Sequence, residues 1–178
     1  QCLYLHFDGA RYCFKKDPNI TLLIEQETEL VGRNDTKIRT RIKEMLEERL
    51  GGQRNAIMWP AKPADIPDND ASFLVAYLPL EFGQKADKDS EALEYFEIAG
   101  NRQRIFRNGI GLAIPSEDQI EALRRAVRYL TAIEQIKEKA RPLNLTDAQR
   151  AQLTERENTG RAAVEACFLR LYTEIWLP

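Results

Sequence analysis

The sequence predicts an α/β domain of three layers, built on a short and mainly parallel sheet. Two nearly continuous apolar runs, at residues 73–80 (FLVAYLPL) and 110–114 (IGLAI), are typical of strands that are buried on both faces. Amphipathic segments lie between and after these runs, and such an alternation implies right-handed crossovers from one parallel strand to the next. We expect a β-hairpin before this sheet and two long helices after it.

The N-terminal hairpin is predicted from residues 3–14, which read LYLHF, Asp8-Gly9 and ARYCF. Asp-Gly between two apolar runs favours a type I′ turn, because both central positions of that turn need a positive φ. In this register one face of the hairpin is packed and carries five apolar side chains: Leu3, Leu5, Phe7, Tyr12 and Phe14.

Two helices are predicted next. Asp17 is expected to cap the first, which starts at Pro18 and ends at Gly32. The second follows Asp35 and Thr36 and has apolar residues at helical spacing from Ile38 to Leu50, and the glycine pair 51–52 ends it.

The remaining elements alternate in character. A short strand at 56–59 precedes a loop rich in proline and aspartate at 60–70, and the strand at 73–80 follows. A helix from 89 or 90 to 99 is expected to stop at Gly100.

Two capping boxes predict the starts of the two long helices. Ser116 with Gln119 opens the first, which ends near Pro142, and Thr146 with Gln149 opens the second. The second helix is expected to run nearly to the end of the chain, with Gly160 weakening or bending it.

Composition excludes several classes of protein. The net charge of −2 gives no global electrostatic case for nucleic acid or for an anionic membrane. Three cysteines are few and odd in number, unlike the paired cysteines of a secreted disulfide framework. The sequence shows neither a secretory leader nor an apolar run long enough to span a membrane. We therefore expect a cytoplasmic protein with no membrane partner. Because the chain opens on Gln1, we expect a piece of a larger protein.

The sequence offers no complete catalytic or cofactor site. No glycine starts a phosphate-binding loop of the Walker A type, and Gly109-x-Gly111 lacks the third glycine of a dinucleotide motif, so tight packing of a neighbouring helix is its expected role. The carboxylates of Asp65, Asp68 and Asp70 lie in a loop where solvation or capping explains them. We expect no cofactor and no enzymatic activity from this chain alone.

Histidine and cysteine give one metal hypothesis. Cys2, His6 and Cys13 can share one face of the hairpin and are zinc-type ligands, but a fourth ligand is not evident. We therefore interpret them as ordinary strand residues and expect no metal. Cys167 lies on the apolar stripe of the last helix, where a small buried side chain is expected.

A cluster of arginines is the most suggestive candidate site. Arg102, Arg104 and Arg107 surround Phe106 just before the strand at 110–114. Such arginines could contact the phosphates of nucleic acid or of a neighbouring subunit's nucleotide. The alternative is a solvated loop in which they pair with nearby carboxylates. Three further arginines on the following helix could extend this patch: Arg124, Arg125 and Arg128.

Several stretches in this order resemble a known family. They are HFDGARYCFKKDPNITLLIE, PAKPADIPDNDASFLVAYLP, AGNRQRIFRNGIGLAIPSEDQIEALRRAVRYLTAIEQI and LNLTDAQRAQLTERE. From about Tyr4 to Tyr172 the chain is similar to the downstream part of large bacterial AAA+ type ATPases that carry domain of unknown function 499. That family is associated with mobile elements and phage defence. Its Walker motifs lie upstream, so the resemblance implies no ATP hydrolysis by this segment, and it implies that the hairpin is the tail of a winged-helix module.

These observations predict two parts, residues 1–32 with the hairpin and its helix, and residues 33–178 with the α/β domain and the C-terminal helical pair. We expect a non-catalytic accessory or assembly domain that contacts other domains or subunits of a parent ATPase. The alternative is a nucleic-acid-binding module of the same ATPase that uses the arginine cluster.

Overall fold

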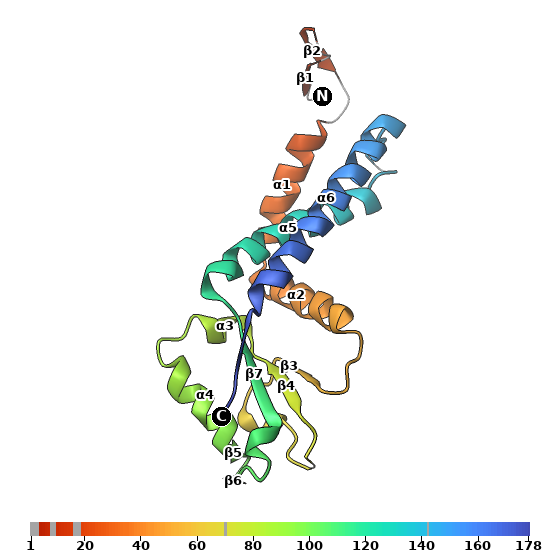
Figure 1. Ribbon diagram of the computed structural model, residues 1–178. Helices are drawn as coiled ribbons and strands as arrows, with labels where there is room; N and C mark the ends of the chain where they lie inside the picture. The colour runs from red at the N-terminus through yellow and green to blue at the C-terminus, as the bar shows by residue number, and fades with distance from the viewer. Residues whose placement is uncertain (1–3, 8–9, 16–18, 70, 142) are drawn as a thin grey trace. The chain divides into compact units, whose positions relative to one another are not determined.

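The computed structural model describes residues 4–7, 10–15, 19–69, 71–141 and 143–178 (Figure 1). It confirms the α/β class: a β-hairpin comes first, a mostly parallel four-stranded sheet lies in the middle of the chain, and two long helices come last.

The strands are β1 Tyr4–Phe7, β2 Tyr12–Lys15, β3 Ala56–Met58, β4 Leu74–Tyr77, β5 Ile98–Ala99, β6 Arg102–Gln103, β7 Ile110–Ile114 and β8 Glu174–Trp176. The α-helices are α1 Ile20–Gly32, α2 Asp35–Leu50, α3 Leu80–Gly83, α4 Lys88–Glu97, α5 Glu117–Glu138 and α6 Asp147–Leu171. Two 3₁₀ turns are η1 Pro63–Asp65 and η2 Arg107–Gly109. None of the helices in the described part of the chain is both long enough and apolar enough to cross a membrane.

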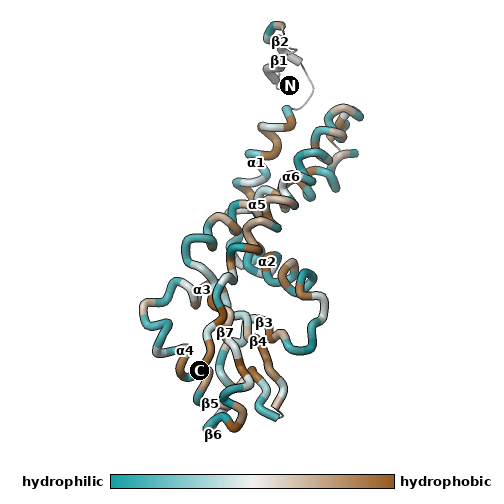
Figure 2. The backbone as a smooth tube through the Cα atoms, viewed as in Figure 1, coloured by the Kyte–Doolittle hydropathy of each residue, from teal (hydrophilic) through white to brown (hydrophobic). Residues whose placement is uncertain are grey.

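The central sheet has the strand order β3-β4-β7-β8. The strands β3, β4 and β7 are parallel, and β8 pairs antiparallel with β7. The predicted strand at 73–80 ends earlier than expected, because Pro79 has no N–H to donate to the ladder and Leu80 instead begins α3. All five residues of β7 are buried, as the apolar run predicts, and Figure 2 shows its apolar colouring.

Both connections between the parallel strands pack on one face of the sheet. The order β3-β4-β7 advances in one direction, and right-handed crossovers that advance together lie on the same side. The core agrees, because Ile66 of the first connection and Phe82, Tyr95 and Phe96 of the second join one apolar cluster. From the sheet and its flanks this cluster includes Ala76, Leu78, Ile110, Leu112 and Ile114.

The chain forms two compact units. The first comprises Gln1–Arg39 and Arg124–Glu165, and the second comprises Thr40–Leu123 and Ala166–Pro178. This division differs from the predicted boundary after residue 32. The reason is that α1 buries its apolar stripe against parts of α5 and α6, in a cluster of Ile20, Ile24, Ile133, Ile136, Leu145 and Leu153.

Local signals at the element ends were partly correct. Strands β1 and β2 pair antiparallel with Phe7 opposite Tyr12, which confirms the hairpin, although its Asp8-Gly9 turn lies outside the described residues. Residues 16–18 also lie outside them, and α1 begins at Ile20. Its N-cap is Asn19 rather than the predicted Asp17, and the Asn19 side chain accepts hydrogen bonds from two backbone N–H groups at 3.0 and 3.4 Å.

The predicted helix end at Gly100 is instead a hairpin turn. Helix α4 ends at Glu97, and β5 then pairs antiparallel with β6, with Ile98 opposite Gln103. Gly100 has a φ of +69°, which suits a two-residue turn between strands. At the last helix, the predicted box is confirmed, because Thr146 and Gln149 exchange hydrogen bonds at 2.8 and 3.3 Å.

Candidate functional site

The carboxyl edge of the parallel strands is filled by aromatic side chains. Open α/β sheets usually bind ligands at that edge where the strand order reverses, but the order β3-β4-β7 has no reversal. The Trp59 indole donates to the Tyr172 hydroxyl at 3.1 Å, and this hydroxyl donates to the Leu78 carbonyl at 2.7 Å. The Tyr77 ring meets the Tyr172 ring edge-on at 5.2 Å. This edge is therefore a packed contact for the segment after α6.

Trp59 itself is strained. Its φ is +46°, in the left-handed region that bulky side chains rarely adopt, yet the residue is buried. Its backbone N–H donates to the Tyr77 carbonyl at 2.9 Å, which extends the β3–β4 ladder by one residue. The surrounding contacts hold the Trp59 backbone in this conformation. The hydroxyl of Tyr172, which accepts the Trp59 hydrogen bond, is itself buried, and this burial raises the pKa of Tyr172 above its usual value.

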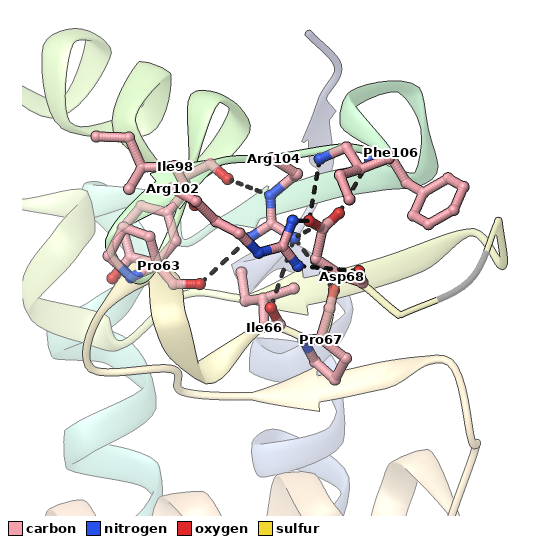
Figure 3. A network of polar contacts seen from close by, with 10 residues as sticks. Pro63, Ile66, Pro67, Asp68, Ile98, Arg102, Arg104 and Phe106 are labelled. Atoms are coloured by element: carbon pink, nitrogen blue, oxygen red, sulfur yellow. Dashed lines mark hydrogen bonds and ion pairs between the residues drawn. The ribbon is translucent and has the colours of Figure 1, made fainter.

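A buried arginine organises the opposite region of the same unit. Arg104 is only 4% exposed, and its guanidinium donates to five backbone carbonyls (Figure 3). The acceptors and distances are Tyr95 at 3.1 Å, Ile66 at 3.5 Å, Pro67 at 3.1 Å, Pro63 at 3.2 Å and Ile98 at 3.3 Å. Arg104 thus ties the 60–70 loop to the end of α4 and to β5.

Asp68 supplies the counter-charge. Its carboxylate accepts hydrogen bonds from the backbone N–H groups of Ile105 at 3.0 Å and Phe106 at 2.9 Å. It lies 2.8 Å from an Arg102 nitrogen and 4.0 Å from an Arg104 nitrogen. Burial raises the pKa of Asp68, but the two N–H donors and the two guanidinium groups outweigh burial, so its pKa lies below the usual value.

The arginine itself is held as a cation. Burial lowers the pKa of Arg104, and the Asp68 carboxylate opposes that change. Because an arginine pKa starts far above neutral, we treat the pair as ionised at pH 7. The charges and the five carbonyl acceptors together satisfy a group that would otherwise be costly to bury.

The backbone that Asp68 holds carries a surface of both apolar and polar side chains. The N–H bonds to Asp68 fix the backbone at residues 105–106, and Ile105 projects outward with 68% of its surface exposed. The Phe106 side chain points away from the polar network in Figure 3. Beside them is a depression of about 530 Å³. We define the Ile105 surface as five of the residues that line this depression: Phe73, Ile105, Phe106, Arg107 and Asn108.

The structure separates the three predicted arginines. Arg107 is exposed and has no charged partner among the described residues, as a contact residue requires. Arg102 is half exposed and pairs with Asp68. Arg104 is buried and its guanidinium is occupied by backbone carbonyls, which weighs against the predicted phosphate contact. Its neighbours Ile66 and Asp68 come from a loop almost 40 residues upstream, and no local pattern indicates that contact. The additional arginines at 124, 125 and 128 belong to the other compact unit.

The other sequence-derived candidates do not form a chemical site. Cys2 lies outside the described residues, as do the side chains of His6 and Cys13. Within the described ranges, no three His, Cys, Asp or Glu residues lie close enough to hold a metal ion. Gly111 packs tightly, but against a strand rather than the expected helix, since a Cβ there would lie 2.8 Å from Ile175.

No family model, curated protein or solved structure matches the chain. The candidate function therefore rests on the geometry of the Ile105 surface.

Proposed function

We propose that this chain is a non-catalytic assembly domain of a larger bacterial ATPase, and that it contacts other domains or subunits of that protein through the Ile105 surface. The observation that carries the proposal is a group of apolar and aromatic side chains beside Arg107, which has no charged partner in the described part of the chain. Aromatic and arginine side chains are enriched at the energetic centres of protein interfaces.

The rigid support of this surface favours the same function. Binding is stronger when a surface is ordered before its partner arrives, because less conformational entropy is lost on association. Asp68 provides that order by holding the N–H groups of Ile105 and Phe106 from inside the domain. The parent ATPase is proposed from the sequence resemblance, and a cytoplasmic location is proposed with it.

Nucleic acid binding is the second candidate. It is favoured by one arrangement, the exposed guanidinium of Arg107 next to the rings of Phe73 and Phe106, since bases stack on aromatic rings. It is weakened by the burial of Arg104 and by the pairing of Arg102 with Asp68, which leave Arg107 as the arginine of this cluster with no charged partner among the described residues.

Site-specific photo-crosslinking separates the two candidates. A benzophenone amino acid is placed at Ile105 in the chain as it is expressed in its host, and a matched control carries it at Leu169. These positions are 68% and 67% exposed, and Leu169 is outside the Ile105 surface. We expect one discrete protein adduct from position 105 and none from position 169. An adduct that nuclease digests would support the nucleic-acid candidate, and equal adducts from both positions would contradict a specific surface.

A further inference from the structure

The last strand of the sheet has a free edge. The order β3-β4-β7-β8 ends at β8, and no strand in the described part of the chain pairs with its outer side. Free edges are usually protected by a very short strand, by charged side chains (lysine above all), by proline or by a bulge. Strand β8 is short and carries one charge, the Glu174 carboxylate, which repels acidic segments but attracts basic ones. The three residues of β8, Glu174–Trp176, include no lysine and no proline. The backbone N–H and C=O groups on this edge can therefore pair with another extended chain.

An apolar depression lies beside the end of β8. It measures about 350 Å³ and lies between α4 and the C-terminal segment. Leu93 and Phe96 line it from α4, together with one carboxylate residue, Asp89. Trp176 and Leu177 line it from β8 and the residue after it. Leu93 is 58% exposed, so this apolar lining is accessible.

An acidic depression lies beside the start of the same strand. It measures about 300 Å³ and shares Trp176 with the apolar one. Three carboxylates line it, from Glu117, Asp118 and Glu174, against a single cation, Lys88. These carboxylates are too dispersed to form a metal site among the described residues, so their charge favours a cationic side chain over a bound ion.

The pleat of the strand relates the two depressions. Side chains two residues apart point to the same face, so Glu174 and Trp176 both face α4 while Ile175 faces the other side. A strand that paired with β8 would therefore place two of its own side chains, also two residues apart, next to the acidic and the apolar depressions.

We propose that β8 accepts an extended segment of a partner polypeptide as a fifth strand, and that this segment carries a basic and an apolar residue two positions apart. The backbone of the segment pairs with the free edge, which is the β-augmentation mode of peptide recognition. The basic side chain lies near Glu174 and the apolar one near Leu93. This site goes beyond the assembly function proposed above, because neither depression shares a residue with the Ile105 surface.

A peptide of known sequence tests the proposal. The probe is a fluorescein-labelled Thr-Leu-Thr-Arg-Thr-Leu-Thr, which presents the basic and apolar pair in both chain directions. Its binding to the full chain is followed by fluorescence anisotropy. We expect weak, saturable binding, and we expect it to weaken about threefold to tenfold when glutamate replaces the arginine, because a like-charge cross-strand pair then replaces an attractive one. A peptide with N-methylated amides on its pairing edge should not bind.

Variants of the protein locate the site. Glu174→Lys should reverse the preference, so that the glutamate peptide binds better than the arginine peptide. Leu93→Glu should abolish binding of the arginine peptide by filling the apolar depression with a charge, while Leu169→Glu, at a 67% exposed position outside both depressions, should leave it unchanged. Circular dichroism checks that each variant is folded.

Three results would overturn the proposal. The first is no saturable binding at millimolar peptide. The second is binding that ignores both Glu174→Lys and Leu93→Glu. The third is a dimer: light scattering of the chain alone would give twice the monomer mass, and Ile175→Lys would restore the monomer mass. A second copy of the chain would then occupy the free edge.

Discussion

Removing the Asp68 carboxylate should strongly destabilise the unit that contains the sheet. In Asp68→Ala the Arg104 guanidinium remains buried without its counter-charge, and the N–H groups of Ile105 and Phe106 lose their acceptor. Both charged side chains of the pair are only 2% exposed, so water cannot replace the lost contacts without opening the loop.

The magnitude follows from these contacts. Each buried N–H that loses its acceptor costs about 1–3 kcal/mol, and removal of one partner of a buried ion pair costs about 3–5 kcal/mol. The two estimates describe overlapping losses, so we take about 3–5 kcal/mol as the decrease in the free energy of unfolding. With a denaturant slope of about 1.5 kcal/mol/M in urea, the midpoint should fall by about 2–3 M.

Tryptophan fluorescence during urea unfolding measures this change in the relevant unit. The chain has two tryptophans, Trp59 and Trp176, and both belong to the unit with the sheet. The matched control is Asp65→Ala in the same loop. Asp65 also accepts two backbone N–H groups, at 2.8 and 3.1 Å, but it is exposed, so its loss should cost only about 1 kcal/mol. Equal midpoint shifts for the two variants would refute the role of the buried pair.

Three further changes test other parts of the structure. Tyr172→Phe should cost about 1–3 kcal/mol in the same fluorescence assay, because the Leu78 carbonyl loses its donor. A change below 0.5 kcal/mol (about the scatter of a surface substitution) would contradict the role given to the Tyr172 hydroxyl. Gly83→Ala should destabilise by about 1–3 kcal/mol or more, since its Cβ would lie 2.2 Å from the backbone oxygen of Pro115; an unchanged urea midpoint would show that the turn is not this close. Hydrogen bonds from Lys137 of α5 and Arg161 of α6 lower the pKa of Glu157. The stability that this carboxylate adds is therefore present above its unfolded pKa of about 4.3 and is lost as pH falls through the folded pKa. Unfolding followed by helical circular dichroism should show Glu157→Gln less stable than wild type at about pH 7. The difference between the two proteins should disappear below about pH 4.

Signals that are local in sequence were sufficient for much of the fold. The exchange of hydrogen bonds between Thr146 and Gln149 is confirmed because both partners of a capping box lie within one helical turn. The run at 110–114 is a buried strand because only a central strand buries five successive residues. Gly100 does not end α4, which stops at Glu97; it turns the chain between β5 and β6, and such a turn needs the same positive φ that a glycine after a helix adopts.

Features that depend on distant contacts could not be predicted. Strand β8 is three residues long and exists because it pairs with β7, which lies more than 60 residues upstream. The pairing of Arg104 with Asp68 likewise joins two loops, and from the sequence alone Arg104 resembles its exposed neighbours. The sequence therefore indicates where the arginine cluster lies. Only the structure shows that Arg104 is buried while Arg102 and Arg107 are exposed.

The native mass of the protein in extracts of its host tests the assembly function most directly. Size-exclusion chromatography with detection of the chain is compared for wild type, Ile105→Glu and Leu169→Glu. We predict that wild type and Leu169→Glu elute together in a large complex, and that Ile105→Glu elutes at a smaller mass because a charge is placed at the centre of the interface. If Ile105→Glu elutes with wild type, the Ile105 surface does not hold the assembly and the proposed function is contradicted.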